Sequence, residues 1–253
     1  MNKQTVISAK HLKKAFGKGE SIQVIYSDLN IDIYKGDFTV IMGSSGAGKS
    51  TLMYSLSGMD KPDGGEIHFD GTDITKLNND RLAVFRRKQC GFVFQQIYLI
   101  DKMNLMDNVI TAGVLTNKDR EDIKNRAKEL FSLVNIPENT WRKTSSQISG
   151  GEAQRAGIVR AVINSPNVLF ADEPTGALNS ANSGAVLDVF TSLHKEGQSI
   201  VMVTHDKKSA LRGNRIIYIK DGKIYGECDL GQFEQDNMER TEKLNKFIEE
   251  MGW

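Results

Sequence analysis

The sequence has 253 residues, of which 39% are hydrophobic and 26% charged, and its 33 Lys and Arg residues nearly balance 32 Asp and Glu residues. This length allows one large domain, or a domain with a sizeable subdomain, and a substantial core. The net charge of +1 excludes the strongly basic balance of a general binder of nucleic acids or anionic membranes.

The sequence also predicts where the chain resides. No apolar run reaches the roughly 18 residues that a membrane-spanning helix needs. Residues 1–5 lead into an alternating segment rather than the apolar centre of a signal peptide, so we expect a cytoplasmic chain. Cys90 and Cys228 are the only cysteines, and they have neither metal-ligand spacing nor disulfide-rich density, so we interpret both as structurally incidental.

The first predicted elements are two strands joined by a turn. Leu29, Ile31 and Ile33 alternate with polar residues, as in a strand with one buried face. A turn at 35–37 then leads into the apolar run 38–42, which we expect to be a buried strand. Because β-rich runs alternate with helical stretches further along, we expect an α/β fold with a mainly parallel core sheet and an N-terminal antiparallel β-subdomain.

A helical insertion is predicted in the middle of the chain. Between about residues 98 and 147 the β signal disappears, and apolar residues recur at helical spacing. These apolar residues are Ile123, Ala127, Leu130, Phe131 and Val134. We therefore expect an inserted helical subdomain at about 98–147.

The C-terminal part combines a hairpin with a helix. Asp221 and Gly222, the preferred pair for a tight turn, separate two β-rich runs. From about residue 232 the chain is charged but carries apolar residues at positions i, i+3, i+4 and i+7. These are Leu244, Phe247, Ile248 and Met251. Residues 232–253 are therefore predicted to form an amphipathic helix.

A phosphate-binding pattern, G-x-x-x-x-G-K-[ST], follows the apolar run 38–42 and precedes a helical run. Its backbone N–H groups can surround phosphates, and the helix N-terminus adds a positive dipole. Lys49 would reach the outer phosphates and Ser50 would bind Mg²⁺. A chance glycine-rich turn is the alternative, but the strand before and the helix after are the context that the motif requires. The expected nucleotide-binding residues here are Gly43, Ser44, Ser45, Gly46, Ala47, Gly48, Lys49, Ser50 and Thr51.

A second apolar run, 168–171, ends in Asp172 and Glu173, which is the pattern of a Walker B segment. Paired carboxylates of this kind can divide two tasks. Asp172 would hold Mg²⁺, and Glu173 would polarise a water molecule for attack on the γ-phosphate. Two solvated acids at a strand end would be a common alternative without the phosphate-binding loop.

A third motif, Ser149, Gly150, Gly151 and Glu152, opens a predicted helix that ends before Pro166. Ser149 and Glu152 fit the capping box S-x-x-E, which would form this helix without any functional role. Capping does not need the paired glycines, which suit close approach of the backbone to an anion at a helix N-terminus. We therefore favour a phosphate-binding function over capping alone.

With these motifs in this order, the sequence resembles the nucleotide-binding subunits of ABC transporters over nearly its whole length. The phosphate-binding loop, Gln95, the motif at 149–152, the Walker B strand and His205 occur in the family's order. The resemblance implies a single P-loop ATPase domain over 1–253, with ATP and Mg²⁺ as ligands. It also implies that residues 149–152 form the signature motif, which acts on the nucleotide held by a second copy.

The resemblance assigns three more residues. Gln95 resembles the glutamine that contacts Mg²⁺ and the attacking water and meets the membrane partner, and His205 resembles the histidine that contacts the γ-phosphate. Phe16 resembles the aromatic residue that stacks on adenine, where tyrosine is more common, and stacking needs only the ring face. The resemblance thus implies four catalytic residues, Lys49, Gln95, Glu173 and His205, and three Mg²⁺ ligands, Ser50, Gln95 and Asp172.

Two positions depart from the family pattern. Glu152 stands where glutamine is usual, and its capping box would turn the carboxylate toward its own helix, so we expect a mild effect. Asn179 replaces the aspartate that usually follows Ala177 and Leu178, in a loop that lies across the family's dimer interface. We expect this second departure to act on hydrolysis rate and coupling.

Phrases at 43–46, 58–62, 91–96 and 172–176 resemble one subgroup, the lipoprotein-release and macrolide-efflux type, which includes antimicrobial-peptide resistance systems. This implies an ATPase that pairs head to tail with a second copy on ATP and drives a separate membrane permease, for export or extraction of a lipophilic or peptide substrate. Binding to that permease would hold the chain at the inner face of the cell membrane. The C-terminal helix is expected to pack on its own subunit or on the second copy rather than on the permease or membrane.

Two alternatives come from other functional classes. A soluble ABC-type ATPase that acts on DNA or ribosomes usually carries a coiled-coil insertion, a second cassette or a basic arm, and none is visible in the sequence. A regulatory nucleotide-binding module with weak turnover is suggested by Asn179 and Glu152. Phosphate release measured with the partner present would separate that module from an enzyme.

Overall fold

The computed structural model describes residues 3–253, so Met1 and Asn2, part of the segment used to predict a cytoplasmic chain, lie outside the described residues. At its centre is a six-stranded sheet in the order β10-β9-β3-β8-β7-β6. Neighbours from β9 to β6 run parallel, and β10 pairs antiparallel with β9. The strands are β3 (Phe38–Gly43), β6 (Cys90–Phe94), β7 (Val168–Asp172), β8 (Ser199–Val203), β9 (Arg215–Lys220) and β10 (Lys223–Asp229).

A second, four-stranded sheet is antiparallel and has the order β2-β1-β4-β5. Its strands are β1 (Thr5–Phe16), β2 (Gln23–Tyr34), β4 (Gly64–Phe69) and β5 (Thr72–Asp73). The α/β class with a mainly parallel core sheet and an N-terminal antiparallel sheet is therefore confirmed.

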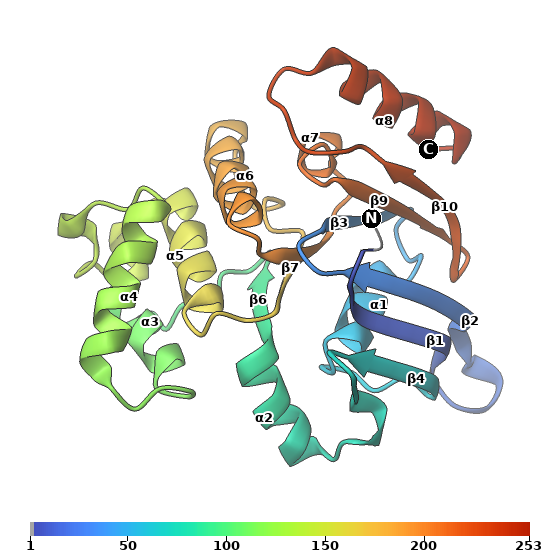
Figure 1. The fold of residues 1–253 in the computed structure, drawn as a ribbon, viewed down its shortest axis with the longest axis horizontal. Coiled ribbons are helices and arrows are strands. Elements are labelled where there is room, and N and C mark those ends of the chain that lie inside the picture. Colours follow the sequence, from blue (N-terminus) through green and yellow to red (C-terminus); the bar gives the residue numbers. More distant parts are fainter. Residues whose placement is uncertain (1–2) are drawn as a thin grey trace.

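Helices cover the core sheet and form a block at one end of the molecule, where α3, α4 and α5 lie together on the left of Figure 1. This block is the predicted helical insertion, extended by α5. The helices are α1 (Lys49–Leu56), α2 (Asn79–Gln89), α3 (Leu105–Gly113), α4 (Arg120–Leu133), α5 (Gly150–Val162), α6 (Ser180–Lys195), α7 (Lys207–Ala210) and α8 (Met238–Glu250).

The six-stranded sheet is buried on both faces. Successive side chains of a strand point to opposite faces, so Val40 and Met42 of β3 belong to one apolar cluster and Ile41 to the other. The first cluster includes residues of α3 to α6 and α8. The second packs α1 between the two sheets, through Leu52 and other residues. The phosphate-binding loop is thus anchored at both ends, by a strand and a helix that are each buried.

The C-terminal segment folds back onto this core. Asp221 and Gly222 have positive φ angles of 49° and 69°, as the tight turn between β9 and β10 requires. Helix α8 buries Leu244, Phe247 and Ile248 in the first apolar cluster. The apolar stripe of α8 therefore packs on its own subunit.

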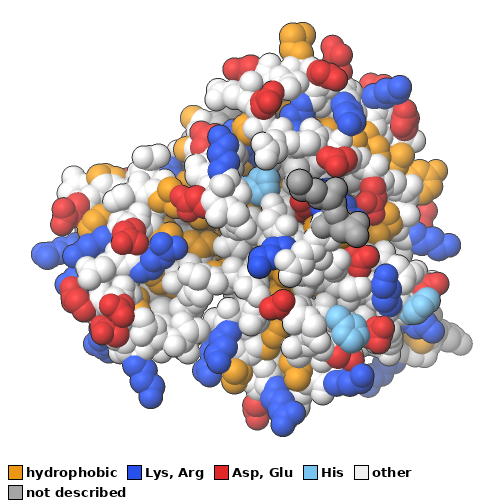
Figure 2. All heavy atoms as spheres, in the orientation of Figure 1, with side chains coloured by type: hydrophobic (Ala, Val, Ile, Leu, Met, Phe, Trp, Pro, Cys, Tyr) orange, Lys and Arg blue, Asp and Glu red, His pale blue; other side chains and the backbone are white. Residues whose placement is uncertain are grey.

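The surface carries charges of both signs. Figure 2 shows Lys and Arg side chains interspersed with Asp and Glu side chains on the face viewed, over the helical block as well as the sheets. Within residues 3–253, no helix combines the length and the apolar character that crossing a membrane would demand.

Candidate active site

The candidate site lies where neighbouring parallel strands end. Phe94, Asp172 and Val203, the last residues of β6, β7 and β8, are in register across the sheet. Because the carboxyl ends of parallel strands share one edge, Gln95 and Glu173 leave the sheet side by side. Strand β3 ends at this edge too and continues directly into the phosphate-binding loop. Ligands bind at this edge in open α/β sheets.

Lys49 closes the phosphate-binding loop on itself. Its Nζ donates hydrogen bonds to the carbonyl oxygens of Gly43 and Ser44, at 2.9 and 2.8 Å. Burial lowers the pKa of the Lys49 ammonium, and the nearby carboxylates of Glu173 and Asp172 act in the opposite direction. The loop therefore holds one partly buried cation near two acids.

The turn before α1 requires a glycine at position 48. Gly48 caps the helix with a φ of 89°, in the left-handed region. A Cβ atom there would lie 2.5 Å from Cγ2 of Ile25. This turn leaves the first N–H groups of α1 open toward the loop, which is the arrangement that binds phosphate.

Asp172 is held by two hydroxyl groups. Ser50 Oγ donates to its Oδ1 at 2.9 Å, and the Tyr54 hydroxyl donates to its Oδ2 at 2.7 Å. Burial, followed by the hydrogen bond to Asp172, raises the pKa of Tyr54. Ser50 and Asp172 together offer the hard oxygen ligands that Mg²⁺ prefers, so these residues fit the metal that the family implies.

Gln95 directly follows Phe94 of β6, which pairs with Asp172 across the sheet. Its amide packs against Gly176, where a Cβ atom would come within 2.9 Å of Nε2. The side chain belongs to an exposed residue at the strand end. Its carbonyl oxygen is a further ligand of the kind that Mg²⁺ accepts.

Glu173 and His205 form the second half of the site. His205 Nδ1 lies 2.8 Å from Glu173 Oε1, and Thr204 Oγ1 donates to Glu173 Oε2 at 3.2 Å. Glu173 has a φ of 45°, in the left-handed region that non-glycine residues rarely adopt. Such strain persists only where surrounding contacts fix it, and here it turns the carboxylate toward the loop after β8.

The signature motif starts α5 as a complete capping box. The backbone N–H of Ser149 donates to Glu152 Oε2 at 2.8 Å, and the Glu152 N–H donates to Ser149 Oγ at 3.2 Å. The hydrogen bonds that the backbone N–H and the hydroxyl of Ser149 donate to the Glu152 carboxylate lower its pKa. Glu152 thus turns back onto its own helix.

One of the paired glycines has a packing reason of its own. Gly151 is buried, and a Cβ atom there would lie 2.8 Å from Cγ and Oδ1 of Asn182. Gly150 and Ser149, by contrast, are exposed. In the described part of the chain, the side-chain hydrogen bonds of Ser149 all go to Glu152, so the structure does not join the signature to the phosphate-binding loop of the same subunit.

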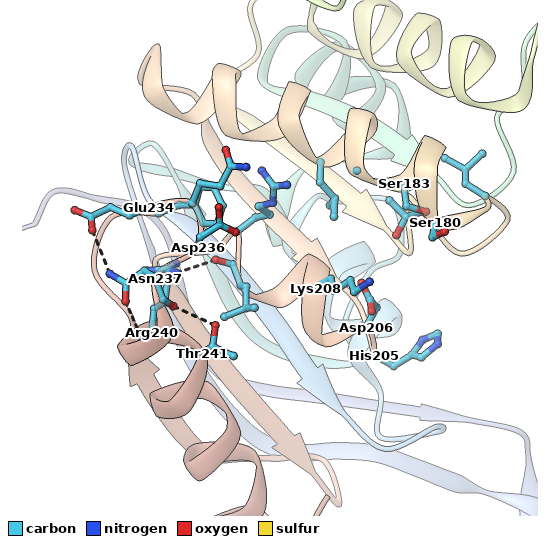
Figure 3. Close-up of a pocket in the computed structure, with 18 of the residues that line it drawn as sticks. Ser180, Ser183, His205, Asp206, Lys208, Glu234, Asp236, Asn237, Arg240 and Thr241 are labelled. Carbon is cyan, nitrogen blue, oxygen red and sulfur yellow. Dashed lines mark hydrogen bonds between the residues drawn. The ribbon is translucent and has the colours of Figure 1, made fainter.

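Two hollows border the site. One, of about 580 Å³, is lined by Gln95, Tyr98, Leu99, Ile148 and Gly150 among others. The other, of about 650 Å³, runs from Glu173 and His205 between α6 and α7 to the segment that precedes α8 (Figure 3). Each hollow is thus lined by predicted catalytic residues that follow strands of the core sheet: Gln95 in the first, and Glu173 and His205 in the second.

The predicted adenine-stacking residue lies apart from these contacts. Phe16, at the end of β1, is 46% exposed, which leaves a ring face available. The ammonium group of Lys14 lies 5.0 Å from the ring centroid. The exposed ring is suited to stacking.

Two residues that organise the site received no role from the sequence. Tyr54 is one, and Gln154 is the other. Gln154 is 1% exposed, and its Nε2 donates to the carbonyl oxygens of Phe94 and Pro174, at 3.0 and 2.8 Å. It therefore ties the signature helix to the segments that carry Gln95 and Glu173. A glutamine on the buried face of a predicted helix was the available signal.

Comparison with known proteins identifies a family match and relatives of this chain. The sequence profile of the ABC transporter family matches residues 26–176. The macrolide export ATP-binding/permease protein MacB of Aggregatibacter actinomycetemcomitans is 39% identical over 90% of this chain, which spans 35% of that relative. The lipoprotein-releasing system ATP-binding protein LolD of Aquifex aeolicus is 39% identical over 88% of this chain and 97% of that protein. The chain thus spans about a third of the first relative and nearly all of the second.

Solved structures agree with the sequence comparison. A dimeric, post-hydrolysis structure of the ATP-binding cassette MJ0796 bound to ADP and Pi has a TM-score of 0.81 and 35% identity, covering 90% of this chain and all of that one. A further dimeric structure of MJ0796 gives the same TM-score at 36% identity. The likeness therefore extends over most of this chain.

Proposed function

The chain belongs to the ABC transporter family, as an ATP-binding subunit that hydrolyses ATP, and from this premise we propose how its residues do so and what they drive. Membership confirms the resemblance and the ATPase activity predicted from the motifs. The observation that carries the proposal is the pairing of Ser50 with Asp172, at 2.9 Å, beside that of Glu173 with His205, at 2.8 Å.

The phosphates of ATP bind to the loop 43–51. Backbone N–H groups of the loop and the N-terminus of α1 surround them, and Lys49 releases its carbonyl partners to bind the outer phosphates. Phe16 stacks on the adenine ring. Ser50, Asp172 and Gln95 would hold Mg²⁺, which would supply positive charge to neutralise the charge that develops on the phosphates.

Glu173 polarises the attacking water. Its carboxylate is oriented by Thr204 and His205, and such an oriented base is what general base catalysis needs. His205, whose side chain is 68% exposed, exchanges its contact with Glu173 for the γ-phosphate when nucleotide binds. The strand ends that carry the two residues are held together, because Asp172 pairs with Val203 and the Glu173 N–H donates to the Val203 carbonyl oxygen at 2.9 Å.

The signature motif acts on the nucleotide of a second copy. Ser149 and Gly150 are exposed, while the phosphate-binding loop surrounds only one side of the nucleotide. Two chains that close head to tail would cover the other side, so ATP binding becomes dimerisation energy. The dimeric structures of MJ0796 support this arrangement.

The cycle of closing and opening drives a separate permease at the inner face of the membrane. MacB and LolD, as named, are a macrolide exporter and a lipoprotein-releasing component, which supports export or extraction of a lipophilic or peptide substrate. Gentle solubilisation of native membranes, followed by pull-down of this chain, is expected to recover one integral membrane protein. Recovery of ribosomal or DNA-bound proteins instead would refute the transporter assignment.

The hollow beside Gln95 is the proposed docking site for a helix of the permease. Tyr98 is 61% exposed there, whereas Leu99 packs partly against the core. We expect Tyr98→Glu to abolish co-purification with the permease because it places a charge in an apolar contact, while the isolated chain keeps its melting temperature. Tyr225→Glu, at a 58% exposed tyrosine on β10, is the control and should co-purify normally. Normal co-purification of Tyr98→Glu would exclude this docking site.

The substitution Asn179→Asp tests whether the departure from the family pattern affects turnover. Oδ1 of Asn179 accepts the Asn182 N–H at 3.0 Å and caps α6. An aspartate caps a helix as well and favours the positive end of its dipole, so Asn179→Asp should fold normally. We expect it to raise phosphate release by the partnered dimer and to leave ATP affinity unchanged, because the phosphate contacts lie elsewhere. Equal turnover in both forms would show the departure to be neutral.

A further inference from the structure

Helix α1 presents two hydroxyl groups to one carboxylate. Ser50 and Tyr54 are four residues apart, so their side chains lie on the same face of the helix, one turn apart. Ser50 occupies Oδ1 of Asp172 and Tyr54 occupies Oδ2, at 2.9 and 2.7 Å. The two contacts fix both the position of the carboxylate and its rotation about the last side-chain bond.

The Tyr54 hydroxyl is a persistent donor. A phenol is protonated at neutral pH, and its O–H is directed at Asp172 Oδ2, at 2.7 Å. The backbone below it is also held, because the Tyr54 carbonyl accepts from the N–H groups of Met59 and Asp60, at 2.9 and 3.1 Å, and from Ser57 Oγ at 3.1 Å. The phenol therefore acts as a rigid support for the carboxylate rather than as a mobile surface group.

A supported carboxylate presents one defined oxygen to a metal. With Oδ2 committed to Tyr54, Oδ1 is the atom that faces Ser50, the other expected Mg²⁺ ligand. We propose that Tyr54 is a positioning residue that orients Asp172 for Mg²⁺, an inference that rests on the proposed Mg²⁺ site. Hydrogen-bond partners of ligating carboxylates commonly change metal affinity by about 10- to 100-fold when removed.

A purely structural role for the phenol predicts a different result. In that case Tyr54→Phe would lower the melting temperature and nothing more. Tyr26 supplies the matched comparison, because its hydroxyl lies 2.7 Å from Oγ of Ser55 on the same helix and it is 2% exposed. Tyr26→Phe thus removes a buried tyrosine hydrogen bond to α1 without touching Asp172.

The experiment measures Mg²⁺ dependence without turnover. Binding of a non-hydrolysable fluorescent ATP analogue to the full chain is followed while MgCl₂ is titrated, and again in EDTA. We expect Tyr54→Phe to need about tenfold more Mg²⁺ at half-saturation and to bind normally in EDTA, while Tyr26→Phe follows the unmodified chain. Melting temperatures of both variants show that each is folded.

The variant Asp172→Asn distinguishes an error about Tyr54 from an error about the Mg²⁺ site. If Asp172→Asn shifts the Mg²⁺ titration but Tyr54→Phe does not, Tyr54 is not a positioning residue and the metal site stands. If Asp172→Asn also leaves the titration unchanged, the proposed metal site itself is wrong. Equal shifts in Tyr54→Phe and Tyr26→Phe would mean that the effect comes from general loosening of α1, and would overturn the inference.

Discussion

Glu173→Gln is expected to lower phosphate release by about two orders of magnitude or more, while ATP still binds. The amide keeps the shape of the carboxylate and presents one oxygen and one NH₂ group to Thr204 and His205, which contact the two carboxylate oxygens of Glu173 at 3.2 and 2.8 Å. It cannot take a proton from water. Because closure precedes hydrolysis, the ATP-bound dimer should accumulate, and size-exclusion chromatography in Mg-ATP should shift the chain from monomer to dimer.

Controls for this variant lie in the same chain. Glu234→Gln makes the same chemical change in an exposed residue that lines the hollow containing Glu173, and it should hydrolyse ATP normally. Adding Ser149→Arg to Glu173→Gln should abolish the dimer, because the serine would meet the other subunit's γ-phosphate. Thermal unfolding of Ser149→Ala without ATP measures the loss of the helix cap, about 1 kcal/mol. Normal hydrolysis by Glu173→Gln would remove this residue from its role, and a dimer that survives Ser149→Arg would contradict the head-to-tail arrangement.

Arg240→Ala is expected to lower the free energy of unfolding by about 3 kcal/mol, a large effect for one residue outside the active site. Arg240 is 5% exposed, and its guanidinium donates to five carbonyl oxygens. The acceptors are Leu211, Gly213, Leu230, Gly231 and Gln232. The side chain therefore joins the start of α8 to the turn between α7 and β9, and to the segment after β10.

The measurement is thermal unfolding, in which we expect a fall of roughly 6 to 12 °C for a chain of this size. Burial lowers the pKa of Arg240, yet an arginine stays charged at neutral pH, so its removal leaves buried acceptors without a donor. Lys243→Ala, at an exposed position of the same helix, is the control and should change stability by less than about 0.5 kcal/mol. Equal melting temperatures for the two variants would show that solvent satisfies these carbonyl groups.

Local patterns explain which site features the sequence could predict. The phosphate-binding loop lies within one strand-turn-helix unit, and the capping box of Ser149 and Glu152 spans a single helical turn. In both, the physics connects residues a few positions apart, so spacing alone is sufficient. The family resemblance supplied the roles of Gln95 and His205, whose neighbours in space are distant in sequence.

Contacts between distant segments explain what was missed. Tyr54 and Asp172 are 118 residues apart, and Gln154 reaches carbonyl groups 60 and 20 residues away. Nothing in the local spacing of a tyrosine on a helix distinguishes a core aromatic residue from the hydrogen-bond partner of a distant carboxylate. Gly151 is a further example, because its packing partner, Asn182, lies in a different helix and no local pattern could reveal it.

The sequence by itself determined the fold class, the order of the motifs and the chemical type of each candidate residue, because periodicity, turn chemistry and motif spacing are properties of contiguous chain. Only the tertiary structure decided which of these residues meet. The parallel register of β6, β7 and β8 brings Gln95, Glu173 and Thr204 to one edge, and the packing of α1 between two sheets sets Tyr54 against Asp172. Register and packing arise from burying apolar faces that lie far apart in sequence, which is why they appear only when the whole chain is folded.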